Sequence, residues 1–333
     1  MSLINSLESK INKIIKLKDI PVIFLSFDEP NADENFNFLK DNHPNPHLVK
    51  RVHGVKGFDA AHKAAAKEAG TARFFTVDAD CKVDAEIWKK NIEITDDIKH
   101  ATLSWSSRNI VNGLVYGNGG VKLWYAEHIK NMKSHEAAKK GDSTHNVDFC
   151  WDAEQYKQMN NTYGVVHNNS SFKQAFRAGF REGVKMGLDQ GFKVRLEDFK
   201  NRMYPANFAR WLIWMTVGRD VENGDWVIYG ARLGAYMLYI DNFDHSVISD
   251  YAWFDKFWEE QLMLLGQGEF INDHSHKLMM DLTHKLGLPL VELDANQSVW
   301  FKHVHFSPSK GAGWPTLLNQ SALPLYGFIL PKY

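Results

Sequence analysis

The chain has 333 residues, of which 44% are hydrophobic and 24% are charged, a composition typical of a soluble protein with one large or two smaller domains. Its formal net charge of -1 excludes a general attraction to polyanions, so binding of nucleic acid requires a local basic surface. With Cys81 and Cys150 as its only cysteines, the chain has no disulfide framework, which favours a reducing, cytoplasmic compartment. No apolar run approaches the roughly 20 residues that cross a bilayer, so we expect no membrane partner.

Strands alternate with a helix in the first hundred residues, which predicts an α/β fold with a mostly parallel, doubly wound sheet. The predicted strands cover residues 22–27, 48–53 and 74–77, and an alanine-rich helix covers residues 58–69. Since parallel strands end at one edge of a sheet, the loops that follow them should meet there. The residues expected to converge at this edge are Asp28, Glu29, Gly54, Lys56, Asp78 and Asp80.

The most informative stretch is residues 73–80, where a short apolar run stops at Asp78 and Asp80. About one such D-x-D pair is expected by chance in a chain of this length, so the spacing alone is weak. Its position is more telling, because open α/β sheets bind ligands at the carboxyl ends of their strands. We therefore expect a metal ion and a phosphorylated donor beside these two acids.

A further strand is predicted at residues 101–105, followed by a glycine-rich loop at 116–120 and a helix at 121–129. Gly119 and Gly120 would let the backbone approach a ligand closely, and the helix start would supply free amides. An ordinary tight turn is the alternative.

The chain turns helical from Ser170 onward. Phenylalanines recur every fourth residue at positions 172, 176 and 180, and a basic stripe runs beside them. This stripe consists of Arg177, Arg181 and Lys185. It predicts a polyanion-binding surface, with a solvated helix face as the alternative. Three more helices are predicted at residues 206–217, 226–239 and 251–265, with most of their tryptophans in the core.

Two strands are predicted near the end, at residues 287–293 and 300–305. His305, leaving the second strand, and Lys310, in the following glycine-containing loop, form a plausible metal-and-phosphate element. Carboxylates with one imidazole suit Mn²⁺ or Mg²⁺ better than a structural zinc site.

These features resemble the GT-A fold glycosyltransferases, which use nucleotide sugars. The shared segments are 26–29, the D-x-D element, Gly119-Gly120, and His305 to Lys310 followed by Trp314. Retaining members carry a late H-x-x-G-x-x-K-P-W segment, from which this chain departs at Pro308 and at residues 311–313, so the anomeric outcome is left open.

The resemblance implies a Rossmann-like mixed sheet flanked by helices, with a helix-rich C-terminal half. It implies a nucleotide-sugar part at 1–166, a helical acceptor part at 167–288 and a C-terminal segment at 289–333 that returns to the donor site. Asp78, Asp80 and His305 would ligate the metal, and Lys310 would hold the diphosphate. The remaining donor-binding residues would be Phe27, Asp28, Glu29, Arg51, Lys56, Asn118, Gly119 and Gly120.

Segments 168–182 and 221–226 resemble those of uncharacterised and DNA-modifying glycosyltransferases from T-even-like phages. Such enzymes put arabinose or glucose on 5-hydroxymethylcytosine in DNA. This resemblance implies a UDP-sugar donor, a double-stranded DNA acceptor gripped by the basic stripe, and the host cytoplasm as the location. The base would be flipped out of the stack to reach the donor.

Asp148 and Asp152, four residues apart, are candidates for a catalytic base or nucleophile, with a helix start as the alternative. His274 and His276 could mimic a metal pair, although a polar helix cap is the preferred interpretation. A glycosyltransferase acting on a protein or glycan, a nucleotidyltransferase and a non-enzymatic DNA-binding module remain competing hypotheses.

Overall fold

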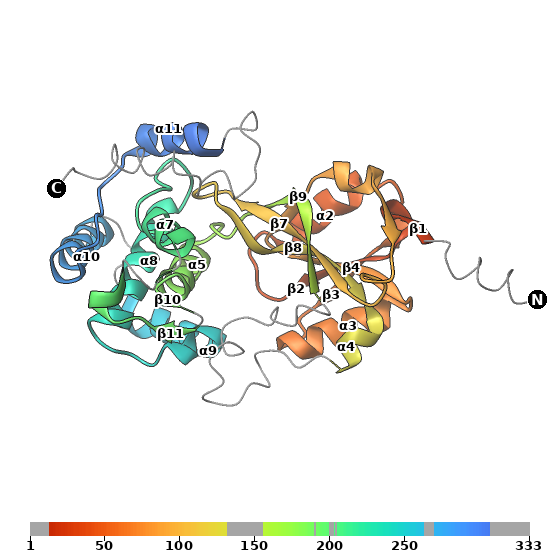
Figure 1. Cartoon of the computed structure of the whole chain (residues 1–333), viewed down its shortest axis with the longest axis horizontal. Helices are drawn as coiled ribbons and strands as arrows, with labels where there is room; N and C mark the ends of the chain where they lie inside the picture. Colours follow the sequence, from red (N-terminus) through yellow and green to blue (C-terminus); the bar gives the residue numbers. More distant parts are fainter. Residues whose placement is uncertain are drawn as a thin grey trace, which may run out of the picture. The chain divides into compact units, whose positions relative to one another are not determined.

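The computed structural model describes residues 13–131, 156–189, 191–199, 203, 205–262 and 270–306 (Figure 1). The chain divides into two compact units. Unit 1 comprises Met1–Ser107, Tyr116–Ala137 and Phe149–Val166. Unit 2 comprises Arg108–Val115, Ala138–Asp148 and His167–Tyr333. None of the helices in the described part of the chain combines the length and the apolar character that a bilayer crossing requires.

A seven-stranded mixed sheet forms the centre of the first unit, in the order β3-β2-β4-β8-β7-β9-β5. Its strands are β2 (Val22–Ser26), β3 (Val49–His53), β4 (Arg73–Asp78), β5 (Cys81–Val83), β7 (Thr102–Asn109), β8 (Val115–Tyr125) and β9 (Tyr156–Val166). β2 pairs in parallel with β3 and β4, whereas β8 runs antiparallel to β4 and β9 antiparallel to β5. A separate antiparallel pair joins β1 (Lys13–Lys16) to β6 (Asn91–Ile94).

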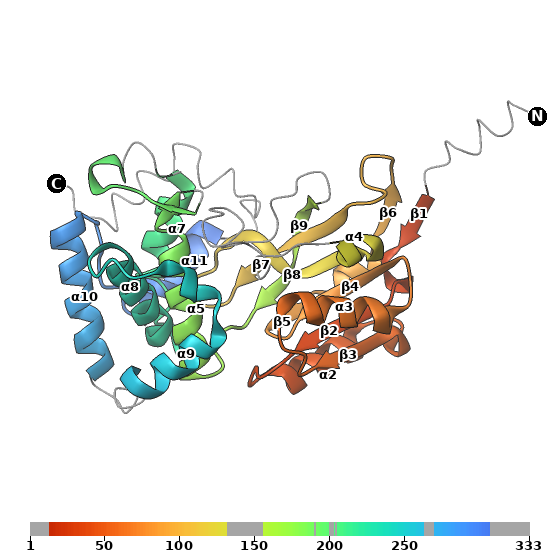
Figure 2. The same cartoon turned by 90° about the horizontal axis from the view of Figure 1, so that it is seen from below.

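Helices cover both faces of the parallel strands because alternate side chains of β2 point to opposite sides. Val22 and Phe24 belong to a core cluster that includes Leu39 of α2 (Ala32–Asn42). Ile23 belongs to the opposite cluster, with residues of α3 (Phe58–Ala69) and α4 (Ala126–Asn131). Figure 2 shows these helices around the strands. The predicted α/β class with a mixed, helix-flanked sheet is therefore confirmed. The expectation of a mostly parallel sheet is wrong, because β8 and β9 form antiparallel pairs within it.

The predicted strands and helix of residues 22–77 are confirmed, and α3 has the expected bounds. The glycine-rich loop and the helix at 121–129 are wrong, since β8 runs through both segments to Tyr125 and only the short α4 follows. The reason is tertiary: a Cβ on Gly119 would lie 2.3 Å from the carbonyl oxygen of Trp105. The glycine thus serves close packing between strands.

The second unit is helical. Its α-helices are α5 (Phe172–Lys185), α7 (Pro205–Trp214), α8 (Gly224–Tyr239), α9 (Tyr251–Phe257), α10 (Phe270–Leu286) and α11 (Ala295–Phe306). A π-helical turn at Trp258–Leu262 continues α9, and a short hairpin joins β10 (Leu188–Asp189) to β11 (Phe192–Lys193). The helices predicted from residue 170 onward are confirmed, the one at 251–265 as far as Leu262, where the described part of it ends. The side chain of Ser171 caps α5 by accepting from the Gln174 amide.

The core of this unit is the crossing of α5 and α8 at glycines. A Cβ on Gly179 would lie 1.9 Å from the Val227 carbonyl oxygen, and one on Gly230 would lie 2.3 Å from that of Phe176. The two backbones can approach this closely only where side chains are missing. Phe176 and Phe180 of the aromatic stripe are buried beside this crossing, together with Trp211, Trp214 and Trp226. The core interpretation of the tryptophans is confirmed for these three.

Both strands predicted near the C-terminal end are wrong. Residues 287–294 form no strand, and residues 300–305 lie in α11. A capping box starts this helix: the Gln297 amide donates to Asp294 Oδ1 and the Asp294 amide to Gln297 Oε1, each at 2.8 Å. The D-x-x-Q spacing was the sequence signal for a helix. His305 is therefore a helical residue, although its side chain lies outside the described part.

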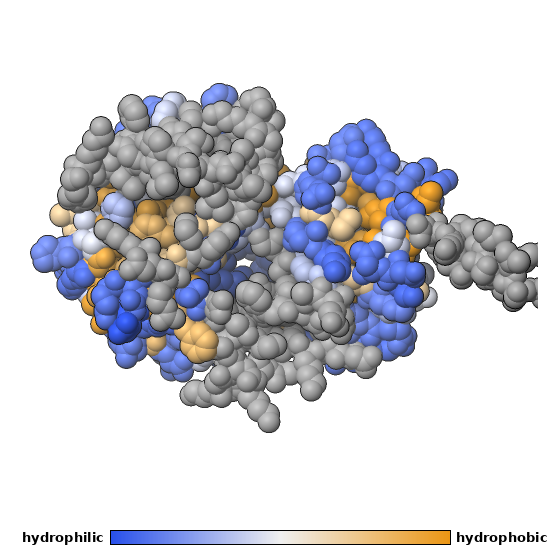
Figure 3. All heavy atoms as spheres, viewed as in Figure 1, coloured by the Kyte–Doolittle hydropathy of each residue, from blue (hydrophilic) through white to orange (hydrophobic). Residues whose placement is uncertain are grey.

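The surface drawn in Figure 3 is mainly hydrophilic where it is described, with separate hydrophobic areas. Large apolar side chains that are at least 37% exposed are scattered over many elements, which is ordinary for a folded protein.

Candidate functional site

Three parallel strands end together at one edge of the sheet in unit 1. In the pairing register, Ser26 of β2 lies opposite His53 of β3, and Leu25 of β2 opposite Asp78 of β4. A hydrogen bond of 3.0 Å joins Ser26 Oγ to His53 Nδ1, and the Gly54 amide donates to the Ser26 carbonyl. The loops after the three strands consequently start side by side, as expected from the alternating pattern.

A hollow of about 390 Å³ opens beside this edge. Its lining residues come from the β2–α2 loop, the first turn of α2 and the end of β3: Asp28, Glu29, Pro30, Ala32, Asp33, Arg51 and His53. Asp28, Glu29 and Arg51 were predicted donor-binding residues, whereas Asp33 and His53 were missed. His53 ends a predicted strand, which was the available signal. Carboxylates outnumber the guanidinium here, so the hollow suits hydroxyl and N–H donors better than phosphate.

Arg51 is held in place from several sides. Its Nε donates to Ser26 Oγ at 2.8 Å and its Nη1 to Asp33 Oδ1 at 2.5 Å. The guanidinium also lies over the rings of Phe24 and Phe36, with 5.8 and 5.6 Å to the ring centres. These contacts fix the planar fork at the rim of the hollow, where it can present its remaining donors to a ligand.

Two predicted donor-binding residues, Phe27 and Lys56, lie in the exposed loops that follow β2 and β3. Phe27 is 47% exposed, and its amide donates to Glu29 Oε2 at 2.7 Å, which closes the loop after β2. An exposed aromatic ring at a ligand edge offers a face on which a base can stack. Lys56 is exposed in the loop between β3 and α3. The roles of these residues remain predictions.

The D-x-D element forms the turn between β4 and β5. Asp78 is the last residue of β4, and Asp80 lies in the turn itself, with both side chains partly exposed. The buried Asn35 of α2 fixes this turn by donating from Nδ2 to the Ala79 carbonyl at 2.8 Å. The position at the carboxyl end of a buried strand is the one expected from the sequence.

The strand β8 packs against this turn at its glycines. A Cβ on Gly120 would lie 2.7 Å from Cys81 Cβ and 3.3 Å from Asp78 Cβ. Gly120 therefore allows β8 to lie directly beside the acidic turn, which differs from its predicted role in a loop that approaches a ligand. Asn118 lies in the same strand, and its side chain is outside the described part.

Lys122 of β8 lies two residues after Gly120 and contacts the acidic turn. The sequence analysis did not identify this lysine. Its side chain is only 5% exposed, and Nζ lies 3.7 Å from Asp78 Oδ2. Nζ also donates to the Gly119 carbonyl at 3.0 Å. A buried ammonium group therefore lies beside the carboxylate of Asp78 in the acidic turn.

A divalent ion fits the chemistry of this turn in part. In the described residues there is no group of three or more His, Cys, Asp or Glu side chains arranged to hold a metal ion. Two carboxylates from one turn are nevertheless the protein contribution that Mg²⁺ commonly has when substrate phosphates complete its coordination. Asp78 and Asp80 are therefore compatible with Mg²⁺ or Mn²⁺, whereas the predicted ligation by His305 rests on an undescribed side chain.

The basic stripe on α5 rests on one tyrosine of α9. Arg177 and Arg181 lie over the ring of Tyr251, at 4.4 and 5.5 Å from its centre, and Arg181 Nη1 donates to the Tyr251 hydroxyl at 3.0 Å. Within the described residues neither arginine forms an ion pair with a carboxylate. Lys185 differs, since its Nζ lies 3.5 Å from Glu182 Oε1.

Three further predicted site residues lie outside the described part of the chain: Asp148, Asp152 and Lys310.

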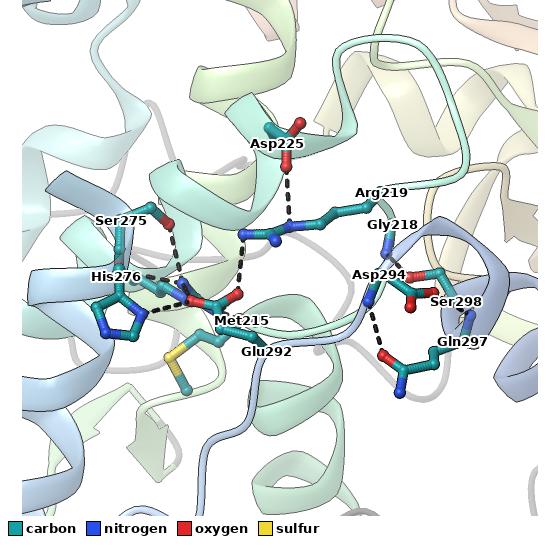
Figure 4. Close-up of polar contacts among 11 residues, drawn as sticks. Met215, Gly218, Arg219, Asp225, Ser275, His276, Glu292, Asp294, Gln297 and Ser298 are labelled. Carbon is teal, nitrogen blue, oxygen red and sulfur yellow. Dashed lines mark hydrogen bonds and ion pairs between the residues drawn. The ribbon is translucent and has the colours of Figure 1, made fainter. Parts of the chain in front are cut away.

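An ionic network around one buried arginine lies elsewhere in unit 2 (Figure 4). The fully buried Arg232 donates to Glu292 Oε1 at 2.8 Å, to the Ser275 carbonyl and hydroxyl, and to the Met215 carbonyl. Arg219 forms two ion pairs: its Nη2 lies 2.8 Å from Glu292 Oε2, and its Nε lies 3.0 Å from Asp225 Oδ1. Burial works to raise the pKa of Glu292, but the two arginines hold it below its usual value.

This network is structural. It ties residues of α8, α10 and the segment before α11 to one another, and its charges are balanced. His276 lies in α10, with Nδ1 3.5 Å from Glu292 Oε1, and His274 lies two residues earlier, within the helix. Neither residue belongs to a metal cluster of the described part.

Comparison with family models and with curated proteins finds no match. Among solved structures, the chain is similar to the crystal structure of a glycosyltransferase involved in the glycosylation of the major capsid of PBCV-1. The TM-score is 0.32 with 12% sequence identity, over 46% of this chain and 98% of that chain. At this level, the likeness carries no information about activity.

Proposed function

We propose that the protein is a metal-dependent glycosyltransferase that takes its sugar from a UDP-sugar at the carboxyl edge of β3, β2 and β4. The observation that carries this proposal is the adjacency of the acidic turn, Asp78 to Asp80, and the polar hollow on neighbouring parallel strands. Ligands of open α/β sheets bind at this edge. The resemblance of the same segments to GT-A enzymes supports the choice of a nucleotide sugar.

The hollow would bind the nucleoside. Asp28 and Asp33 can accept hydrogen bonds from ribose hydroxyls or base N–H groups, Arg51 can donate to base carbonyls, and Phe27 can stack on the base. The diphosphate would then extend toward the acidic turn. A bound Mn²⁺ or Mg²⁺ would supply positive charge to the departing nucleoside diphosphate. Asp148 or Asp152 would serve the acceptor hydroxyl, and Lys310 the diphosphate.

For the acceptor, we propose 5-hydroxymethylcytosine in double-stranded DNA, with arabinose or glucose as the sugar. Support comes from the phage resemblance of segments 168–182 and 221–226 and from the two arginines of α5 that have no carboxylate partner in the described residues. Guanidinium groups bind phosphates bidentately, which suits a DNA backbone. A host-cytoplasmic location follows if the chain is phage-encoded.

The decisive experiment is mass spectrometry of intact nucleosides. DNA containing hydroxymethylcytosine is incubated with the protein, Mn²⁺ and a panel of UDP-sugars, and the Asp80→Asn variant is run alongside. A mass increase on the modified base that the variant fails to produce is the expected result. Metal-dependent UDP binding without any increase would overturn the DNA acceptor and favour a protein, glycan or already glycosylated base. DNA binding that needs neither metal nor UDP-sugar, without transfer, would favour a non-enzymatic module.

A further inference from the structure

Three side chains at the ends of β2 and β3 form a connected set of hydrogen-bonding groups beside the hollow. Arg51 Nε donates to Ser26 Oγ at 2.8 Å, and Arg51 Nη2 lies 3.4 Å from His53 Nδ1. Ser26 Oγ lies 3.0 Å from the same ring nitrogen. One arginine therefore contacts the serine and the histidine at once, and the serine contacts both of the other residues.

The direction of these hydrogen bonds follows from what each group can donate or accept. A guanidinium has N–H donors and no acceptor, so Arg51 requires acceptors at Ser26 Oγ and at His53 Nδ1. The serine hydroxyl accepts from the arginine and keeps its own proton to donate to Nδ1. A neutral imidazole carries one proton, on one of its two ring nitrogens. Since Nδ1 accepts, the ring proton of His53 lies on Nε2.

This Nε2–H group is the part of the set that a ligand can meet. His53 is exposed and lines the hollow, whereas Ser26 is only 7% exposed. The carboxylates around the hollow, those of Asp28, Glu29 and Asp33, can only accept hydrogen bonds when they are ionised. A carbonyl oxygen of a ligand also only accepts. His53 therefore supplies an uncharged donor for such an oxygen.

We infer that His53 is a specificity-determining residue whose Nε2–H group donates to a carbonyl oxygen of the nucleotide base, and that Ser26 and Arg51 are positioning residues that fix this tautomer. This inference rests on the proposed function, because it takes the nucleoside of the donor as the occupant of the hollow. With the opposite tautomer, the ring would present a lone pair to the base carbonyl, and no hydrogen bond would form.

The tautomer can be read by nuclear magnetic resonance. Long-range proton–nitrogen correlation spectra separate protonated from unprotonated imidazole nitrogens, and the His53 signals are those missing from the spectrum of His53→Gln. In mildly alkaline buffer, where ordinary imidazoles are neutral, we expect the wild type to carry the proton on Nε2. Ser26→Ala removes the hydroxyl from the set, and its His53 signals should shift toward a mixture of both tautomers. A proton on Nδ1 in the wild type would overturn the inference.

Two substitutions of His53 separate the contributions of its ring nitrogens to binding. His53→Gln can place an amide donor near the position of Nε2, whereas His53→Asn is too short to reach beyond the position of Nδ1. The affinity for UDP in the presence of Mn²⁺ is measured by calorimetric titration. The glutamine variant should stay within about twofold of wild type, and the asparagine variant should bind about tenfold more weakly, since it loses one hydrogen bond.

Two controls accompany this titration. His47→Gln changes an exposed histidine of the short 3-10 turn Pro46–Leu48, and it should bind UDP like the wild type. Inorganic pyrophosphate with Mn²⁺ is the matched ligand because it has no base, so all of these variants should bind it with the same affinity. Circular dichroism of each variant checks that it is folded.

The outcomes separate the inference from the proposed function. If the wild type binds UDP but the glutamine and asparagine variants of His53 bind it equally well, whether weakened or not, the inference is overturned and the proposed function stands. A loss of pyrophosphate affinity in His53→Asn as large as its loss of UDP affinity also overturns the inference alone, because the effect then does not come from the base. If the wild type binds UDP neither with nor without Mn²⁺, both fail.

Discussion

The charged groups of the two units are used in different ways. At the sheet edge of unit 1, Asp28, Asp33 and Asp80 are partly or largely exposed around a hollow and a turn. In unit 2, Arg232 is fully buried and donates to Glu292 and to two main-chain carbonyls. Water competes for exposed charges, so an exposed ion pair such as that of Asp33 with Arg51 stabilises the fold little and can be exchanged for a contact with a ligand. Buried charges cannot be left unpaired and serve the fold.

The largest expected effect tests the buried side of this comparison. Glu292→Ala leaves Arg232 without its carboxylate, and we expect the free energy of unfolding to fall by about 3–5 kcal/mol. Urea denaturation followed by circular dichroism measures the decrease. Asp33→Ala is the matched control, because Asp33 also pairs with an arginine but is 87% exposed. It should change stability by about 1 kcal/mol or less. If both variants lost the same unfolding free energy, the buried and the exposed ion pair would contribute equally to stability, contrary to this comparison.

The second prediction concerns the exposed side. Asp80→Asn should reduce sugar transfer by at least about 100-fold, because a metal-assisted step loses a charged ligand. Its unfolding free energy should change by no more than about 1 kcal/mol, because the Asp80 side chain is only partly buried. Asp78→Asn should lose activity and also stability, since Lys122 loses its counter-charge. A strongly destabilised Asp80→Asn protein would contradict this interpretation of the turn.

Acidification should weaken unit 2 through Glu292. Its pKa is held below the ordinary value of 4.5, so below pH 4.5 the unfolded chain binds a proton that the folded protein resists. This contribution to stability is present above pH 4.5 and is lost as pH falls through the folded pKa. The stability difference between wild type and Glu292→Gln should therefore narrow as the pH falls from neutral to below 4.5. A gap independent of pH would show that the carboxylate charge contributes nothing.

The smallest expected effect lies on α5. Arg177→Gln should lower the slope of log K for DNA against log salt by about 1, as expected when one phosphate is no longer neutralised. Lys185→Gln should change the slope less, because Lys185 is already paired with Glu182. Filter binding at several salt concentrations gives both slopes. Equal slopes for wild type and Arg177→Gln would remove this arginine from the acceptor surface.

The local pattern determined much of the secondary structure. Apolar runs predicted β2, β3 and β4, and the alanine-rich segment between Phe58 and Ala69 predicted α3 with its observed bounds. The four-residue period of Phe172, Phe176 and Phe180 predicted α5. These signals are local, because strand and helix periods are written in neighbouring residues. The placement of Asp78 and Asp80 at a strand end followed from the same pattern.

Tertiary structure alone decided what the remaining residues do. Gly119 and Gly120 are locally typical of a turn, yet they lie within a strand because β8 must pass close to Trp105 and Cys81. No spacing in the sequence pairs Lys122 with Asp78 or Arg232 with Glu292, since the partners of each pair are far apart along the chain. An interaction between distant residues depends on how the elements pack, and burial then sets its strength. The sequence thus determined that Asp78 and Asp80 lie at the end of a strand, and the packing decided that Lys122 lies beside Asp78.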